Sequence, residues 1–163
     1  MTQFCYFCFH QKHTKMIIRQ AKESDAASIV NFQLAMAMET EQLQLHQPTV
    51  EKGVAAVFAD SSKGIYYVAE SENMVVGSLL TTFEWSDWRN GTVLWVQSVY
   101  VLPEFRSKGI FSKLYKHIQA LVLSSADLHG IRLYADLSNI SAQGVYEHLG
   151  MTAEHYRMYE WMK

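Results

Sequence analysis

The sequence lacks an excess of charge of either sign, and it lacks long apolar runs. Its net charge is −2 over 163 residues, which argues against a broad surface for nucleic acid or anionic membranes. No apolar run approaches the ~20 residues of a membrane-spanning helix. The N-terminal segment also lacks the apolar stretch of a secretory signal. We therefore expect a cytoplasmic protein with neither a nucleic-acid nor a membrane partner.

Cysteine is absent outside one short segment. Cys5 and Cys8 lie close to His10 and His13, and Cys and His side chains can bind zinc tetrahedrally. A structural zinc site normally draws its ligands from two separate places, and the later histidines have no partner at metal-ligand spacing. We therefore predict no metal site, and we interpret residues 1–15 as a poorly ordered extension.

The remaining composition is that of one globular domain, which we place at residues 16–163. Hydrophobic residues make up 49% of the chain and charged residues 18%, so the chain can bury a core. Alternating and helical patterns then predict a mixed central sheet covered by helices. We expect strands over residues 16–21, 65–70, 74–85, 93–101, 131–137 and 153–161, and helices over residues 23–42, from 48, from 110 and over 138–150.

A hairpin is predicted where Asn90-Gly91 separates two strands, since this dipeptide favours a two-residue turn. That turn would pair Trp88 with Val93 and Glu84 with Gln97, and would set a carboxylate among aromatic rings on one face. Such a face suits a cation. The alternative is an aromatic hairpin that packs on the core and leaves Glu84 in solvent. The residues of this face are Glu84, Ser86, Trp88, Trp95 and Gln97.

The stretch Arg-Ser-Lys-Gly-Ile-Phe, residues 106–111, stands where a strand gives way to a long amphipathic helix. A helix start exposes backbone N–H groups and partial positive charge, and a phosphate can bind there. Gly109 allows close approach, and Arg106 and Lys108 add cationic side chains. The pattern is neither a Walker A loop nor a dinucleotide fingerprint. Alone, it is also compatible with a solvated surface loop.

Two motifs give this stretch a context. Residues 99–111 resemble the acetyl-CoA-binding motif of the GNAT superfamily of N-acetyltransferases, Arg/Gln-x-x-Gly-x-Gly/Ala after a strand ending in Val-x-Pro-Glu-Tyr. Arg106 and Gly109 match, whereas Phe111 departs because the family usually has a small residue there. Residues 139–151 resemble the family's Asn-x-x-Ala-x-x-x-Tyr-x-x-x-Gly-Phe/Met segment through Asn139, Ala142, Tyr146, Gly150 and Met151.

The resemblance covers roughly residues 16–163 and implies a fold and a donor. It implies an α/β (α+β) acyl-CoA N-acyltransferase fold, a mixed and mostly antiparallel sheet of about six strands with a V-shaped splay, flanked by about four helices. It also implies acetyl-CoA as acetyl donor. The expected donor-binding residues are Val99, Tyr100, Val101, Arg106, Ser107, Lys108, Gly109, Ile110, Phe111, Asn139, Ala142 and Tyr146.

The implied reaction is direct attack of a primary amine on the thioester. Tyr146 is the candidate general acid for the leaving thiolate, the alternative being a tyrosine that only packs. Many family members carry a carboxylate on the strand that here holds Gln97, so the base is open. Glu84 is our candidate to bind or deprotonate the acceptor. The candidate acceptor-binding residues are Glu84, Trp88, Trp95 and Gln97.

Three functional interpretations follow. The first is an N-acetyltransferase whose acceptor is a small cationic amine rather than a protein amine. The second is a catalytically inactive acyl-CoA-binding regulatory module, which Phe111 and Gln97 favour. The third, a generic phosphate-binding domain, requires both motif matches to be accidental. Homodimers are common among soluble proteins and in this family, so a dimer through an exposed strand or the aromatic hairpin is a further expectation.

Overall fold

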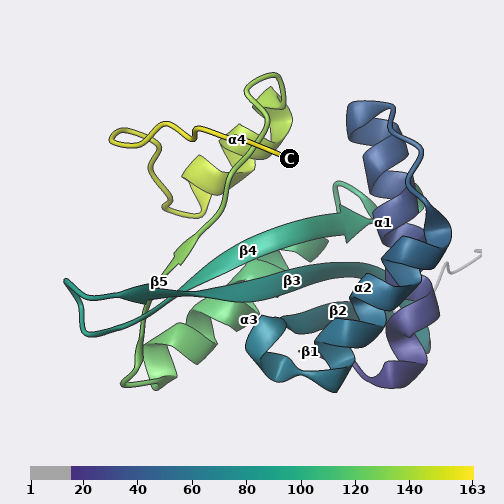
Figure 1. Cartoon of the computed structure of the whole chain (residues 1–163), viewed down its shortest axis with the longest axis horizontal. Helices are drawn as coiled ribbons and strands as arrows, with labels where there is room; N and C mark the ends of the chain where they lie inside the picture. Colours follow the sequence, from purple (N-terminus) through teal and green to yellow (C-terminus); the bar gives the residue numbers. More distant parts are fainter. Residues whose placement is uncertain (1–15) are drawn as a thin grey trace, which may run out of the picture.

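The computed structural model describes residues 16–163, which form a five-stranded sheet with helices on both faces (Figure 1). The strands lie in the order in which they occur in the sequence. Neighbours from β1 to β4 are antiparallel, and β4 and β5 are parallel. The strands are β1 (Met16–Gln20), β2 (Ile65–Ser71), β3 (Met74–Ser86), β4 (Gly91–Val101) and β5 (Leu128–Arg132); the α-helices are α1 (Ala26–Glu41), α2 (Gln47–Ala59), α3 (Ile110–Ser124) and α4 (Ile140–His148); and the 3-10 turns are η1 (Glu23–Asp25), η2 (Ser61–Lys63) and η3 (Pro103–Phe105).

Helices α1 and α2 cover one face of the sheet. Ile29 of α1 and Val54 of α2 are buried against Tyr66 and Val68 of β2. Helix α2 begins with Pro48 in its first turn, where the missing N–H of proline costs no hydrogen bond. The apolar spacing in both helices therefore predicts the face that each one buries.

Helix α3 covers the opposite face with one apolar stripe. Ile110, Leu114 and Ile118 are at most 2% exposed and pack against Leu79 of β3 and Val96 of β4. Because Ile110 is the first residue of α3, the helix start is anchored in the core while its N–H groups remain at the surface. The core thus fixes where α3 begins relative to the end of β4.

A network of charged side chains sets the position of α1. Arg19 of β1 donates to Asp25 at 2.7 Å and to Glu70 of β2 at 2.6 Å. Asp25 is 5% exposed, and its hydrogen bonds with Arg19 lower the pKa of its carboxyl, with burial acting in the opposite direction. The buried charge is therefore paired, as buried charges generally must be. Since Asp25 directly precedes α1, the pair ties the start of this helix to the sheet.

The predicted hairpin exists, but its predicted register is wrong. Ser86 pairs with Gly91, so residues 87–90 form the loop, and Trp88 lies in that loop and is 89% exposed. Glu84 pairs with Val93 rather than with Gln97. The physical reason lies across the sheet: a Cβ on Gly91 would stand 2.1 Å from the ring of His129. This glycine serves the close approach of the chain leading into β5 and not a two-residue turn.

The observed register differs from the predicted one by an even number of residues, since Glu84 pairs with Val93 and not with Gln97. Most of the residues predicted to share a face of the sheet therefore still do so. Glu84, Trp95 and Gln97 lie on one face of the sheet, because alternate residues of a strand share a face. Leu80, which pairs with Gln97, packs in the cluster beneath α1 and α2. The predicted aromatic and acidic face is therefore the face that these two helices cover, without Trp88.

The predicted α/β fold is confirmed, with one correction at the C-terminus. The strand expected over residues 153–161 is not formed, and the one expected over 131–137 is displaced: β5 spans Leu128–Arg132, so residues 133–137 lie outside it. Residues 151–163 contain neither helix nor strand, and Tyr156, Tyr159 and Trp161 are 83–87% exposed. Alternation of apolar residues indicates that a segment can pair, but pairing also requires a neighbouring strand. Figure 1 shows this segment beside α4, away from the sheet.

Candidate active site

The segment between β4 and α3 forms a compact turn. Ser107 has φ 59° and Gly109 φ 70°, so two residues in the left-handed region reverse the chain before α3 starts. The N–H of Lys113 donates to the carbonyl of Gly109 at 3.1 Å. The N–H groups before it in the first turn have no carbonyl within the helix to bind. They form a cluster of donors at the positive end of the helix dipole.

This helix start fits the diphosphate of acetyl-CoA. A Cβ built on Gly109 would meet no other heavy atom within 4 Å, so the space above the turn is open. The ammonium group of Lys108 lies 5.0 Å from the ring centre of Phe105, beside the same turn. The ring of Phe111 packs against Tyr115 and Tyr146, with centroids 6.2 and 5.3 Å apart. Its backbone N–H belongs to the donor cluster.

The side chain of Arg106 contacts the end of β4 and the end of α1. Its Nε donates to the carbonyl of Val101 at 2.9 Å, and its Nη2 lies 2.6 Å from Oε2 of Glu39. The guanidinium also lies 5.3 Å from the ring centre of Tyr100. The side chain predicted to hold the diphosphate is thus paired with a carboxylate at the end of α1.

Strand β4 is irregular just before this turn. Leu80 pairs with Gln97 and Ser78 with Tyr100, so two residues of β4, Ser98 and Val99, face one residue of β3. Ser98 has φ 51°, which a non-glycine residue adopts at a cost. Such a bulge removes backbone groups from the ladder. A strand interrupted in this way can offer backbone groups to another molecule.

The other neighbour of β4 is also lost at this point. Strand β5 pairs with β4 only from Thr92 to Trp95. After Arg132 the chain rises away from β4 towards α4, as Figure 1 shows. The predicted V-shaped splay is therefore present. Within residues 16–163, the end of β4 from Val96 to Val101 has no strand on the side where β5 pairs with its first half. A slender extended molecule can lie along this edge.

Helix α4 brings Tyr146 to the start of α3. Its ring meets that of Phe111 edge-on, at an interplanar angle of 72°. Burial raises the pKa of the Tyr146 phenol above its ordinary value, so the group keeps its proton at neutral pH. The helix begins at Ile140, two residues after the predicted start, with Asn139 as its cap: the side chain of Asn139 accepts the N–H of Ala142 at 3.1 Å. This oxygen of Asn139 therefore has a structural role in the cap.

Glu84 lies in a network of its own on the α1 face. Its carboxylate accepts the indole N–H of Trp95 and a guanidinium N–H of Arg132, each at 2.5 Å. These contacts, the Trp95 bond first, lower the pKa of Glu84, so its charge is retained but its affinity for a proton is weak. Gln97 donates to Thr82 at 2.8 Å alongside. Both carboxylate oxygens are therefore already bound, one by Trp95 and one by the cationic side chain of Arg132.

Two residues of these networks were missed by reasoning on the sequence, Glu39 and Arg132. A signal for Glu39 exists: it stands in the last turn of α1 together with Glu41, where the helix dipole disfavours negative charge. An unfavourable charge at a helix end indicates a partner elsewhere. Arg132 gives no such signal, because its position in β5 is ordinary for an edge strand.

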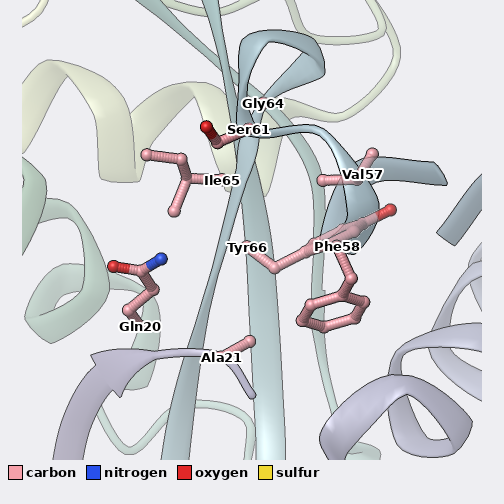
Figure 2. Close-up of a pocket in the computed structure, with 8 residues that line it drawn as sticks. All are labelled: Gln20, Ala21, Val57, Phe58, Ser61, Gly64, Ile65 and Tyr66. Atoms are coloured by element: carbon pink, nitrogen blue, oxygen red, sulfur yellow. The ribbon is translucent and has the colours of Figure 1, made fainter. Parts of the chain in front are cut away.

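A separate small pocket lies where β1 ends and β2 begins, beside the end of α2 (Figure 2). None of the predicted site residues lines it, and its lining contains no charged side chain. It is therefore not part of the candidate active site. The lining residues are Gln20, Ala21, Val57, Phe58, Ser61, Gly64, Ile65 and Tyr66.

Two further features can be stated for residues 16–163. In this part of the chain, no three His, Cys, Asp or Glu side chains gather where they could hold a metal ion. No helix within it is both long and apolar enough to cross a membrane. The cluster of Cys5, Cys8, His10 and His13 falls outside the described residues.

The parallel pair β4–β5 that separates beside the start of α3 is the arrangement that the resemblance to the acyl-CoA N-acyltransferase fold leads us to expect. Residues 33–151 match the model of the Acetyltransferase (GNAT) family, and the chain belongs to that family. The predicted resemblance is thereby confirmed. The chain is an acetyltransferase, and acetyl-CoA is its donor.

Relatives of known sequence and structure agree with this assignment. The chain is 30% identical over 144 residues to a thialysine N-epsilon-acetyltransferase from Bos taurus, covering 83% of each protein. Among solved structures, a possible acetyltransferase from Clostridium difficile 630 is 41% identical with a TM-score of 0.84, covering 91% of this chain and 97% of the other. A predicted acetyltransferase with acetyl-CoA from Clostridium acetobutylicum shares the fold, with a TM-score of 0.71 and 16% identity, covering 90% and 96%.

The turn before α3 yields a first prediction. Gly109→Ala should weaken acetyl-CoA binding by at least about tenfold, because a Cβ would occupy the space that phosphate oxygens approach. The left-handed backbone should also cost about 1 kcal/mol of unfolding free energy. Calorimetric titration with acetyl-CoA and urea unfolding measure the two effects.

The matched control is Gly53→Ala, in an open position within α2. Alanine there should stabilise the protein by up to about 1 kcal/mol and leave acetyl-CoA binding unchanged. A Gly109→Ala protein that binds acetyl-CoA as tightly as the wild type would contradict the assignment of this turn.

Proposed function

We propose that the protein transfers the acetyl group of acetyl-CoA to the primary amine of a small cationic molecule, by direct attack in a ternary complex. The proposal rests on three features that meet at the end of β4: the bulge at Ser98 and Val99, the divergence of β5, and the start of α3. Holding two reactants together in this geometry supplies much of the catalysis.

In this proposal the donor lies along the end of β4. The backbone of Val99, Tyr100 and Val101 binds the pantetheine arm, and a free N–H at the bulge stabilises the oxyanion that develops on the thioester. The diphosphate is held by the donor cluster of the first turn of α3. The turn that precedes α3 adds its own groups, and the residues proposed to hold the diphosphate are Arg106, Ser107, Lys108, Gly109, Ile110 and Phe111.

The chemical step needs a neutral amine and an acid. The amine nitrogen attacks the thioester carbon, the carbon–sulfur bond breaks, and the thiolate takes the phenolic proton of Tyr146. The nitrogen loses a proton through solvent and the phenol takes one back, so a neutral amine gives the acetamide and CoA thiol with no net proton; one proton is released when the amine is counted from its ammonium form. The raised pKa of Tyr146 supports this role, because the group is protonated before the step.

The acceptor is assigned to the α1 face of the sheet. In this proposal an acceptor ammonium shares the Glu84 carboxylate with Arg132 and lies beside Trp95 and Gln97, which add aromatic and polar surface. The bovine relative, whose name gives the ε-nitrogen of thialysine as acceptor, supports a small amine over a protein. Trp88 lies in the exposed loop beyond this face and could contact only the far end of an acceptor.

The alternative function, an inactive acyl-CoA-binding regulator, is less well supported. Phe111 had favoured it, but its ring packs against Tyr115 and Tyr146, and its N–H is free. Binding alone would need no acid at the site, whereas Tyr146 is held beside the start of α3. Turnover with any amine, read as release of CoA thiol, decides between the two.

Removal of the proposed acid tests the mechanism. Tyr146→Phe should lower kcat at least about tenfold, because general acid catalysis typically contributes 10²–10⁴-fold, while the Kd for acetyl-CoA stays the same. Thiol release in the presence of a panel of amines measures kcat, and calorimetry measures Kd, with CoA and ATP as comparison ligands. Tyr159→Phe, at an 87% exposed position, is the control. Full turnover by Tyr146→Phe would remove this residue from the chemistry.

Substitution of Glu84 tests the acceptor site. Glu84→Gln should raise the KM for the amine about tenfold, since a charged hydrogen bond is lost, and should leave acetyl-CoA binding unchanged. Glu72→Gln, at an exposed position in the β2–β3 turn, serves as control. An unchanged KM together with full turnover in Glu84→Gln would exclude this carboxylate from acceptor binding and from proton transfer.

We also propose a symmetric homodimer in which the C-terminal segments, residues 153–163, pair with the second copy. The segment alternates like a strand, its large side chains are exposed, and the outer edge of β5 borders no strand within residues 16–163. A second copy offers the same edge and the same segment, as two-fold symmetry requires.

Sedimentation of the full chain at micromolar concentration tests this arrangement. The wild type should sediment as a dimer, and the double variant Tyr159→Ser, Trp161→Ser as a monomer. Leu123→Ser, which changes an 82% exposed residue of α3, should remain a dimer. A monomeric wild type would disprove the dimer.

A further inference from the structure

Glu39 occupies a position where a negative charge is unfavourable for its own helix. It lies in the last turn of α1, at the negative end of the helix dipole, and that turn contains no basic residue. The side chain is 39% exposed, so it is neither buried by packing nor free in solvent. Its position is therefore explained by its partners and not by the helix.

Two side chains from the end of β4 bind this carboxylate. The hydroxyl of Tyr100 donates to Oε1 at 2.7 Å, and Arg106 donates to Oε2 at 2.6 Å. These hydrogen bonds, the Tyr100 bond first, lower the pKa of Glu39, so it is ionised at neutral pH. The ring of Tyr100 stacks on Phe32 of α1 at 5.3 Å between centroids. The carboxylate is thus held against the α1 face of the sheet.

The two partners of Glu39 differ in what acetyl-CoA does to them. Tyr100 is 5% exposed and stays in place. Arg106 is 44% exposed and precedes the turn whose donors take the diphosphate. A diphosphate carries more negative charge than a carboxylate and forms bidentate bonds with a guanidinium. When the diphosphate binds, Arg106 turns to this stronger partner. Glu39 then keeps the hydrogen bond from Tyr100 but loses its ion pair with Arg106.

The released carboxylate faces the region assigned to the acceptor. Gln97 and Tyr100 flank the bulge at Ser98, and both side chains lie on the α1 face, Gln97 with Leu80 and Tyr100 with Phe32. In the proposed function Glu84 is already the carboxylate assigned to the reacting end of the acceptor, and Glu39 is a second carboxylate on the same face of the sheet. The group that fits Glu39 is therefore a second, non-reacting ammonium of the acceptor.

We propose that Glu39 binds a second cationic group of the acceptor, and that it becomes available when the diphosphate of acetyl-CoA engages Arg106. The inference rests on the proposed function and narrows its substrate class to small molecules with a primary amine and a further ammonium. It also predicts that the acceptor binds more tightly after the donor. The donor's diphosphate takes Arg106 out of the ion pair, and this leaves Glu39 available to the acceptor.

The test compares a diamine with a monoamine of the same length, 1,5-diaminopentane and pentylamine, by thiol release. The wild type should have a kcat/KM at least about tenfold higher for the diamine, and Glu39→Gln should abolish most of that ratio while pentylamine is little affected. Glutamine still accepts the Tyr100 hydroxyl, so the local structure is preserved. Calorimetry should show tighter acetyl-CoA binding by Glu39→Gln, since Arg106 is no longer paired.

The control is Glu41→Gln, an exposed residue in the same last turn. A ratio that falls equally in Glu41→Gln, or that is unchanged in Glu39→Gln, would overturn the inference, as would a wild type without diamine preference. A wild type that binds acetyl-CoA but acetylates no amine would instead refute the proposed function, and the inference with it.

Discussion

The interruption of hydrogen bonding along β4 is the constraint on which the active site depends. Up to Trp95 this strand is paired on both sides, antiparallel to β3 and parallel to β5. Beyond that residue β5 diverges, and the bulge at Ser98 and Val99 disturbs the ladder with β3. Unpaired backbone groups inside a fold need partners. This is why the proposed function places an extended molecule with amide groups of its own at the end of β4.

The same strand end brings together two helix ends of opposite polarity. The last turn of α1 carries Glu39 and the segment before α3 carries Arg106, and each charge has the unfavourable sign for its nearby helix end. Their ion pair compensates both. Because both side chains are partly exposed, this pair contributes little to stability. In the proposal above, its role is to be opened by ligands, the diphosphate replacing Glu39 at Arg106 and an ammonium replacing Arg106 at Glu39.

The two clusters beneath the helices give these features their positions. One cluster seats α1 and α2 on the sheet, and the other seats α3, whose first residue, Ile110, is already buried. A turn anchored by a buried residue holds its N–H groups in place without a ligand. Preorganised donors of this kind need no rearrangement when negative charge arrives, which is the usual basis of their effect in enzymes.

The sequence by itself determined the local features: the helices and the faces they bury, the turn around Gly109 and the family motifs. Each depends on residues within a few positions of one another, and periodicity and propensity act at that range. The tertiary structure alone decided the hairpin register, because Gly91 lies so close to the ring of His129 in β5 that a side chain would not fit there. It also decided the unpaired C-terminal segment and the pairs Glu39–Arg106 and Glu84–Arg132, which join residues 67 and 48 positions apart. Such contacts arise only when separate elements pack, and no local pattern encodes the partner.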